Sequence, residues 1–236
     1  MERYLLSIKG KRLKIVAVYF DRKNKYRNLL NVFLKSAAAK MPDVGIDLIK
    51  VCAPQVISRK HDMAHAFNIA AEKAISSKGP VAVCDIDLLF LHSIESAFKL
   101  DFDVAVTVRR KYKYNTGLWL MRPTEKARAF VKQWIHITKC MMNHPKQEKN
   151  IALIGKYAGI DQASLAMAIK KNKKAKVLEL QCSEWNSCQG EWPEYNNETK
   201  VLHVKSALRG IAMRKRTLVP EEKYLIPLAK IWRSYL

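Results

Sequence analysis

The chain has 236 residues, of which 49% are hydrophobic, and it carries 43 Lys and Arg against 21 Asp and Glu, a formal net charge of +22. This size and apolar content suffice for one α/β domain with a buried core, which excludes a miniprotein that depends on disulfides or a structural metal. The charge excess predicts a surface that meets a polyanion, namely nucleic acid, anionic lipid or an acidic glycan; the alternative is a generic solubilising surface.

The sequence favours an intracellular protein. No stretch reaches the roughly 18 apolar residues of a transmembrane helix, and the apolar run Ile15–Phe20 after the basic start is too short for a secretory signal. The five cysteines are odd in number and scattered, which favours reduced thiols. Only Cys182 and Cys188 are close enough in sequence to be considered as a disulfide pair.

The first half of the chain alternates predicted strands and helices. Segments rich in β-branched residues predict strands, and apolar spacing of three and four residues predicts helices. A helix is expected to begin at an N-cap on Ser58 and to end before Gly79-Pro80. In order, the expected elements are a strand at 13–20, a helix at 26–39, a strand at 46–51, a helix from 58 to about 76, and a strand at 81–84.

The second half continues this alternation. Thr124 is a good N-cap for a long helix, Asp161 for a shorter one, and Pro220 is expected to open a C-terminal helix. Strands are expected at 103–108, 116–121, 177–180 and 200–204, with helices from 124 to about 142 and from 161 into the lysine run 170–176. The order predicts an α/β fold with a mostly parallel central sheet flanked by helices and ligands at the carboxyl ends of its strands. We expect one catalytic domain over residues 1–219 and a C-terminal helical extension over 220–236.

Two carboxylates follow the predicted strand at 81–84. Asp85 and Asp87 are one residue apart at its carboxyl end. Hard oxygen ligands in this position suit Mg²⁺ or Mn²⁺, with a bound diphosphate completing the coordination. The chain has neither a P-loop nor a G-x-G-x-x-G motif, which argues against kinase and dehydrogenase chemistry.

Further motifs follow this D-x-D in the order found in one enzyme class. Tyr114-Asn115-Thr116-Gly117 resembles an N-[ST]-G element, Gly159-Ile160-Asp161-Gln162 a D-Q element, and Leu202-His203-Val204-Lys205 a late histidine element. With the first strand, these motifs resemble the GT-A class of nucleotide-sugar glycosyltransferases, particularly glycogenin and bacterial lipopolysaccharide galactosyltransferases, from Lys14 to Lys205. The chain departs from the family's His-x-x-Gly-x-x-Lys pattern after His203.

The resemblance implies a Rossmann-like GT-A fold and a set of site residues. It implies Mn²⁺ or Mg²⁺ held by Asp85, Asp87 and His203, and a nucleoside-diphosphate sugar, most commonly a UDP-sugar, as donor. Asp161 and Asn115 are the expected catalytic residues. The expected donor-binding residues are Tyr19, Asp21, Arg59, Asp85, Gly117, Gln162, Lys205 and Arg209.

The acceptor is expected to be polyanionic, because cations crowd the motifs. Arg109, Arg110, Lys111 and Lys113 run into Asn115, lysines fill 170–176, and more cations lie at 209–216. Trp185 and Trp192 are expected to stack on the acceptor.

Three acceptor hypotheses remain open. The leading one is a viral-type enzyme that glycosylates a hydroxymethylated base in DNA, which would have to leave the duplex stack. The second is a bacterial lipopolysaccharide or capsule transferase at the membrane surface, with 220–236 as an interfacial helix, although that segment could equally close the core. The third is a non-enzymatic nucleic-acid-binding module. We expect the protein in the cytoplasm of a bacterium or a virus-infected host cell, or peripherally at the inner membrane.

Overall fold

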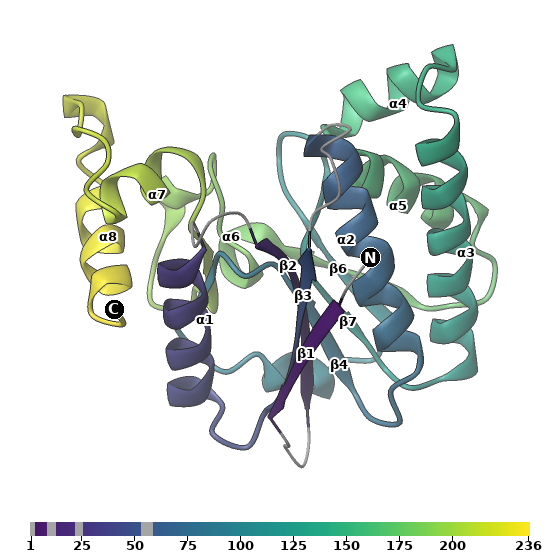
Figure 1. Ribbon diagram of the computed structural model, residues 1–236, viewed down its shortest axis with the longest axis horizontal. Coiled ribbons are helices and arrows are strands. Elements are labelled where there is room, and N and C mark those ends of the chain that lie inside the picture. Colours follow the sequence, from purple (N-terminus) through teal and green to yellow (C-terminus); the bar gives the residue numbers. More distant parts are fainter. Residues whose placement is uncertain (1–2, 9–12, 22–25, 53–58) are drawn as a thin grey trace.

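A mixed β-sheet forms the centre of the molecule (Figure 1). The computed structural model describes residues 3–8, 13–21, 26–52 and 59–236. Its main sheet has the strands β1 (Arg3–Ile8), β2 (Lys14–Asp21), β3 (Gly45–Cys52), β4 (Val81–Cys84), β6 (Val104–Val108), β7 (Tyr114–Met121) and β8 (Val177–Gln181). Their order is β1-β3-β2-β4-β7-β6-β8. Strands β2, β3, β4, β6 and β8 run in one direction and β1 and β7 in the other. The predicted mostly parallel α/β sheet is confirmed.

Helices cover both faces of this sheet (Figure 1). The described helices are α1 (Arg27–Lys40), α2 (Arg59–Ile75), α3 (Glu125–Asn143), α4 (Glu148–Tyr157), α5 (Ile160–Lys171), α6 (Cys182–Trp185), α7 (Ser206–Ala212) and α8 (Leu225–Arg233), with 3₁₀ turns η1 (Glu95–Lys99), η2 (Trp192–Glu194) and η3 (Pro220–Glu222). In the described part of the chain, no helix has the length and apolar character needed to cross a bilayer.

Alternate residues of each strand divide the core between the two faces, as the period of a strand requires. Val16 and Trp119 pack with α2, α3 and α5, whereas Ile15, Ala17 and Leu118 pack on the opposite face with α1. Because both faces are buried, the central strands are almost continuously apolar. This explains why strand β4 could be predicted to the residue.

A second, two-stranded sheet pairs β5 (Leu88–Phe90) with β9 (Val201–His203) in antiparallel register. In this pairing Leu88 lies opposite His203, and the backbone N–H of Val204 donates to the carbonyl of Asp87 at 2.8 Å. The small sheet therefore carries a late segment of the chain back to the residues that follow β4.

The C-terminal helix closes a third part of the core. Leu225, Leu228, Ala229 and Trp232 of α8 are buried against α1, α7 and the small sheet. The apolar face of α8 is therefore turned inward, which supports the core-closing alternative for this segment over the interfacial helix.

Some elements differ from those expected. Ser58, the expected N-cap of α2, lies outside the described residues, whereas Thr124 caps α3 as expected, because its side chain accepts a hydrogen bond from Ala127 N at 3.1 Å. Helix α5 is capped by Gly159, so Asp161 lies inside its first turn and its side chain is left for other contacts. Helices α4, α6 and α7 and strands β1 and β5 were not predicted, and the helix expected to open at Pro220 begins at Leu225, after a 3₁₀ turn at Pro220–Glu222.

The lysine run 170–176 was expected near the active face, but it lies at the opposite edge of the sheet. It joins the end of α5 to the start of β8, which is parallel to β6, and Lys176 Nζ lies 2.5 Å from Asp101 just before β6. These lysines therefore lie at the amino-terminal edge of the parallel strands. The structure corrects the expectation that they surround the predicted active face.

Candidate functional site

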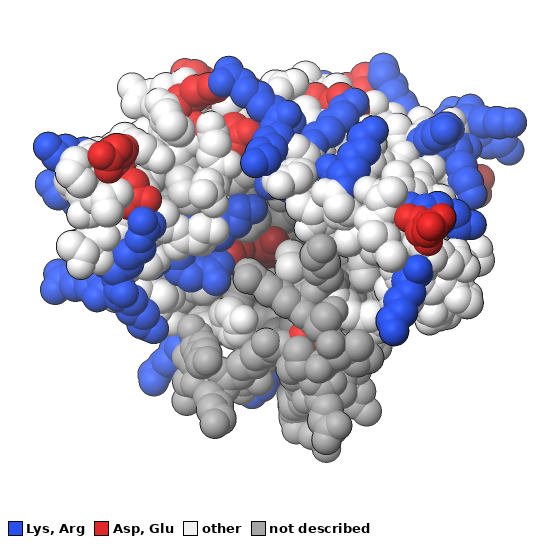
Figure 2. All heavy atoms as spheres, turned by 90° about the horizontal axis from the view of Figure 1, so that it is seen from above, with Lys and Arg blue, Asp and Glu red and all other residues white. Residues whose placement is uncertain are grey.

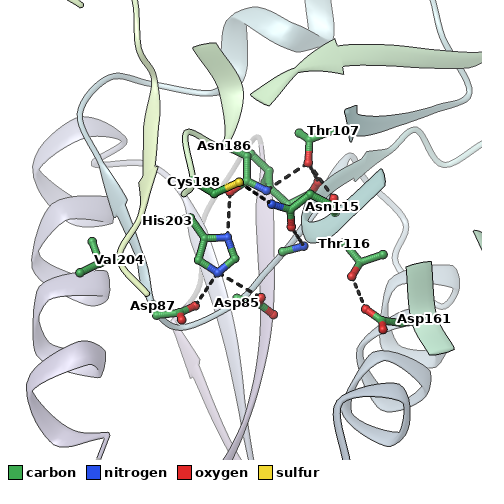
Figure 3. A network of polar contacts seen from close by, with 12 residues as sticks. Asp85, Asp87, Thr107, Asn115, Thr116, Asp161, Asn186, Cys188, His203 and Val204 are labelled. Carbon is green, nitrogen blue, oxygen red and sulfur yellow. Dashed lines mark hydrogen bonds and ion pairs between the residues drawn. The ribbon is translucent and has the colours of Figure 1, made fainter. Parts of the chain in front are cut away.

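Three metal-ligand side chains meet at the carboxyl end of β4 (Figure 3). Asp85 and Asp87 follow this strand directly, and the small sheet brings His203 to them. His203 Nε2 lies 3.1 Å from Asp87 Oδ1 and 3.5 Å from Asp85 Oδ2, and one ligand atom from each of the three residues lies within 4.8 Å of the others. The structure thus brings together the three residues expected to bind the metal.

Asn186 contacts the ring nitrogen of His203 that faces away from the two carboxylates. The side-chain oxygen of Asn186 lies 3.1 Å from His203 Nδ1, and its amide nitrogen donates to Thr107 Oγ1 at 3.0 Å. Thr107 Oγ1 in turn donates to the carbonyl of Asn115 at 2.7 Å. Asn186 is fully buried. An oxygen acceptor at Nδ1 places the proton on that nitrogen, which leaves the lone pair of Nε2 directed at the carboxylates.

Gly117 provides the space for this cluster. Its backbone N–H donates to Asn115 Oδ1 at 3.0 Å, and its carbonyl accepts from Asp85 N at 2.8 Å. A Cβ at this position would lie 2.5 Å from His203 Cε1 and 2.9 Å from Asp85 Oδ2. Any larger residue would therefore displace two of the three side chains.

The two carboxylates have opposite pKa shifts. Burial, followed by the negative charge of Asp87, raises the pKa of Asp85 to about 6. Burial also acts to raise the pKa of Asp87, but His203, Arg209 and Lys205 outweigh it and hold that pKa well below its usual value. Asp87 is thus ionised throughout the physiological range, whereas Asp85 loses its proton around pH 6.

This donor set fits a hard divalent cation. Two carboxylates and an imidazole converge, and the mutual repulsion that raises the pKa of Asp85 is what a bound cation would relieve. Arg209 already pairs with the second oxygen of Asp87, while its Nε donates to the carbonyl of Val204 at 3.0 Å. The arrangement therefore also places one fixed cationic side chain at the edge of the cluster.

A cavity of about 430 Å³ opens beside the cluster. Besides Asp85 and Asp87, its lining includes Tyr19, Tyr26, residues of α2, Thr116 and Asp161. Figure 2 shows acidic side chains deep in a central hollow, with Lys and Arg side chains around part of its rim. The volume and the mixture of apolar walls and few polar groups are typical of a small-molecule site.

The D-Q element contributes one residue to the cavity and one behind it. Asp161 lines the cavity, accepts a hydrogen bond from Thr116 Oγ1, and has a pKa raised by burial, which that hydrogen bond partly opposes. Gln162 Oε1 accepts instead from Arg109 Nη2 at 2.7 Å and does not line the cavity. Gln162 therefore fastens the loop after β6 to helix α5.

The other expected donor residues are distributed around the same place. Tyr19 and Arg209 line the cavity, and Lys205 is partly buried beside the cluster, where its charge lowers the pKa of both aspartates. The side chains of Asp21 and Arg59 lie outside the described part of the structure, although the backbone places them at the end of β2 and the start of α2.

Asn115 supports the cluster and does not line the cavity. It is 4% exposed, its Oδ1 accepts from Gly117 N, and its Nδ2 donates to Cys188 Sγ at 3.3 Å. The adjacent Thr116 is the polar side chain of this element that faces the cavity. The position of Asn115 therefore supports a direct catalytic role less well than the position of Asp161 does.

The structure corrects the expectation for the two tryptophans. Trp185 and Trp192 are 7% and 2% exposed, and both belong to core clusters. Trp192 Nε1 also donates to the carbonyl of Ser187 at 3.1 Å. Neither ring offers a face on which an acceptor could stack.

The basic residues expected at the acceptor side form the tight loop between β6 and β7. Arg109 N donates to the carbonyl of Lys113 at 2.7 Å, and Tyr112 at the tip has φ of 58° and is 39% exposed. Arg110 pairs with Glu194 and Lys113 with Glu179, whereas Lys111 Nζ lies 5.2 Å from the centre of the Tyr112 ring. The loop thus presents cations and an aromatic ring next to the cavity.

Sequence reasoning missed several residues that shape the site. Asn186 lies in an irregular segment, so no periodicity or motif spacing drew attention to it. Tyr26, Met63 and Trp119 line the cavity, but nothing in the sequence separates them from the apolar and aromatic residues that pack in the core. Thr116 was within the quoted motif, and its polar side chain between Asn115 and Gly117 was the signal that could have identified it.

The fold is shared with solved glycosyltransferases. One, involved in the glycosylation of the major capsid of PBCV-1, aligns with a TM-score of 0.57 and 12% identity over 84% of this chain and 95% of its own. The glycosyltransferase GlyE of Streptococcus pneumoniae TIGR4 aligns with a TM-score of 0.58 and 15% identity over 96% of this chain, as does its apo form. This chain spans 60% of the GlyE chain. These likenesses confirm the predicted fold.

No family model matches the sequence, and no curated protein matches it. The case for a function therefore depends on the fold and on the geometry of the site.

Proposed function

We propose that the protein is a metal-dependent glycosyltransferase that uses a nucleoside-diphosphate sugar, of which a UDP-sugar is the leading candidate. The observation that carries this proposal is the meeting of Asp85, Asp87 and His203 beside a cavity, at the carboxyl end of β4, in a fold shared with solved glycosyltransferases. Ligands of open α/β sheets bind at this edge.

The cavity residues have distinct roles in this proposal. Asp85, Asp87 and His203 hold Mn²⁺ or Mg²⁺, which would neutralise the negative charge of the diphosphate as it leaves. Lys205 and Arg209 add fixed positive charge at the same place. Tyr19 and Tyr26 offer ring faces to the nucleobase, and Asp161 with Thr116 meets the sugar. The acceptor hydroxyl attacks the anomeric carbon of that sugar.

We propose a polyanionic acceptor, with a hydroxymethylated base in DNA as the leading candidate. Support comes from the cationic β6–β7 loop and from exposed Arg214, Lys215 and Arg216 after α7. The Lys and Arg side chains of both groups would neutralise phosphates of a duplex and release their counterions into solution. The inward-facing apolar side of α8 weakens the membrane-surface alternative, which depended on that helix. Lipopolysaccharide and simple nucleic-acid binding are outcomes of the test.

The test measures sugar transfer with Mn²⁺ and a set of radiolabelled nucleotide sugars. Acceptors are a duplex with hydroxymethylated bases, the same duplex without them, and lipopolysaccharide cores. We expect label on the hydroxymethylated duplex alone and its loss, with that of donor hydrolysis, in Asp87→Ala. Asp101→Ala is the matched control, because this exposed aspartate lies at the other edge of the sheet.

Each other outcome has a meaning. Label on lipopolysaccharide alone would replace the DNA acceptor with a glycan. DNA binding without donor hydrolysis in any combination would contradict the enzyme proposal and favour a binding module.

A further inference from the structure

Arg209 is the one Lys or Arg side chain among the described residues that line the cavity. It belongs to α7, the short helix that follows His203 and Lys205, and its side chain is 27% exposed. Its Nη2 pairs with Oδ2 of Asp87, while its Nε donates to the carbonyl of Val204 at 3.0 Å. A single guanidinium therefore connects a proposed metal ligand with the wall of the cavity.

Both oxygens of the Asp87 carboxylate have a partner in this arrangement. Oδ1 lies 3.1 Å from His203 Nε2, and Oδ2 is paired with Arg209. The side chain of Asp87 is only 14% exposed, so water and salt screen the pair with Arg209 less than they would screen a surface pair. Arg209 therefore neutralises much of the charge that Asp87 could offer to a cation.

A divalent cation held by Asp87 would meet this guanidinium at close range. The two positive charges of the cation and the charge of Arg209 would share one carboxylate and repel each other. The cation would also have to weaken the existing ion pair in order to use Oδ2. Both effects lower the affinity of the cluster for a cation that arrives alone.

A diphosphate in the cavity would remove this conflict. Phosphate oxygens carry negative charge and are strong acceptors for guanidinium N–H groups. A guanidinium has several N–H donors, so Arg209 can bind a phosphate through its terminal nitrogens while Nε stays on the Val204 carbonyl. The negative charge of the phosphates then lies beside both Arg209 and the cation and offsets their repulsion.

We infer that Arg209 couples the binding of the metal to the binding of the nucleotide; this inference rests on the proposed function. Arg209 opposes the cation in the absence of the diphosphate and binds the diphosphate when both are present. The protein therefore takes up the cation and the nucleoside diphosphate together more readily than it takes up either one alone. The adjustment is confined to one side chain, so the backbone that carries Asp87 and His203 stays in place.

The test measures the affinity for Mn²⁺ with and without saturating UDP, in the native protein and in Arg209→Gln. Electron paramagnetic resonance of free Mn²⁺ gives both affinities, after correction for the Mn²⁺ that UDP binds in solution. Without UDP, Arg209→Gln should bind Mn²⁺ about tenfold more tightly, because the competing charge is gone. The factor by which UDP tightens Mn²⁺ binding should be smaller in the variant by about tenfold or more.

Two further variants assign the effect to Arg209. Arg216→Gln is the matched control, because this arginine follows α7, pairs with Glu222 and does not line the cavity, so both affinities should stay native. Arg209→Met keeps the apolar stem and its packing and should reproduce Arg209→Gln. A disturbed fold would weaken Mn²⁺ binding, so the expected gain in affinity cannot come from misfolding.

The outcomes separate this inference from the proposed function. The inference is overturned if both Arg209 variants bind Mn²⁺ no more tightly than the native protein, if UDP tightens Mn²⁺ binding by the native factor in them, or if Arg216→Gln gains as much affinity. Failure of the native protein to bind Mn²⁺ and UDP together contradicts the proposed function instead.

Discussion

Single residues decide whether the metal cluster can form. The ligands come from two distant parts of the chain, and the residues around them fix the available space, the orientation of the imidazole and the charge of the carboxylates. Gly117 provides the space, Asn186 orients the imidazole, and Asp85 sets how the charge of the cluster depends on pH. Each of these residues can be changed separately.

Gly117→Ala should abolish tight metal binding. Its Cβ would come within 2.5 Å of His203 and 2.9 Å of Asp85, so at least two ligands must move. We expect an Mn²⁺ affinity lower by about tenfold or more and a loss of stability of about 1–3 kcal/mol from overpacking. Electron paramagnetic resonance of free Mn²⁺ and chemical denaturation measure these effects. Gly155→Ala is the control, because no atom lies within 4 Å of its Cβ position; equal Mn²⁺ binding by both variants would contradict the prediction.

Asn186→Leu should weaken metal binding without touching a ligand. It removes the acceptor from His203 Nδ1 and leaves Thr107 without a donor. Residues that orient a metal-binding histidine typically contribute 10–100-fold in affinity, so a loss of about that size is expected. Asn186→Asp keeps an oxygen toward Nδ1 and should lose less.

Nitrogen-15 shifts of His203 report the same effect independently. The proton should reside on Nδ1 in the native protein and redistribute in Asn186→Leu. An unchanged tautomer together with native Mn²⁺ affinity would show that Asn186 acts only in packing.

Metal affinity should depend on pH through Asp85. Because its pKa is raised to about 6 in the metal-free protein, a proton competes with the cation below that pH, whereas Asp87 remains ionised. Affinity should therefore be constant above about pH 7 and fall toward roughly tenfold per pH unit well below 6. Titrations of Mn²⁺ between pH 5 and 8 measure this, and a midpoint near 4 would disprove it. Asp85→Asn should remove the dependence at the cost of weaker binding.

At the scale of elements, position along the sheet decides which cations can meet an acceptor. The β6–β7 loop lies at the carboxyl edge, next to the cavity, because Arg109 is fastened to Gln162 beside Asp161. The lysines of 170–176 follow the D-Q element closely in sequence, but helix α5 separates them from it in space. The 12 residues of α5 rise about 1.5 Å each, or roughly 18 Å in total, toward the opposite edge.

This placement predicts different effects for two lysines. Lys111→Ala should weaken binding to duplex DNA and reduce the slope of log affinity against log salt by about 1, as expected for the loss of one phosphate contact. Lys174→Ala removes the same charge at the far edge and should leave the slope unchanged. Fluorescence anisotropy at several salt concentrations makes the comparison. Equal slopes for the two variants would show that the acceptor does not dock at the β6–β7 loop.

The elements that could be predicted are those with a strong local pattern. Strand β4 is a short apolar run ended by charge, and α3 has an amphipathic face behind the cap of Thr124. By contrast, α4 has ten residues and no side-chain cap at its N-terminus, and β5 has only three residues. The pairing of β5 with β9, which positions His203, depends on contacts between distant parts of the chain and has no local signal.

At the scale of the whole molecule, charge is divided between the hollow and the rim. The net charge of +22 is spread over both edges of the sheet, while the acidic cluster lies deep in the hollow (Figure 2). The sequence indicated the excess of positive charge and the ordered motifs, which was enough to predict the fold and the three residues that meet at the end of β4. The sequence could not indicate which aromatic side chains are buried. Trp185 and Trp192 lie in an irregular segment, where aromatic residues can be exposed as readily as buried, and they were therefore expected at the surface.

The small sheet has a consequence for how the protein would bind the proposed metal. Pairing of Leu88 with His203 and the hydrogen bond from Val204 N to the Asp87 carbonyl connect the segments that carry Asp87 and His203 through the backbone. The chain between Asp87 and His203 is therefore closed into a loop during folding. The entropy cost of that closure belongs to folding and does not reduce the affinity for the metal. The apoprotein should act as a rigid receptor, with a single concentration-dependent phase in stopped-flow binding of Mn²⁺. A slower, concentration-independent phase would reveal that the receptor assembles only around its ion.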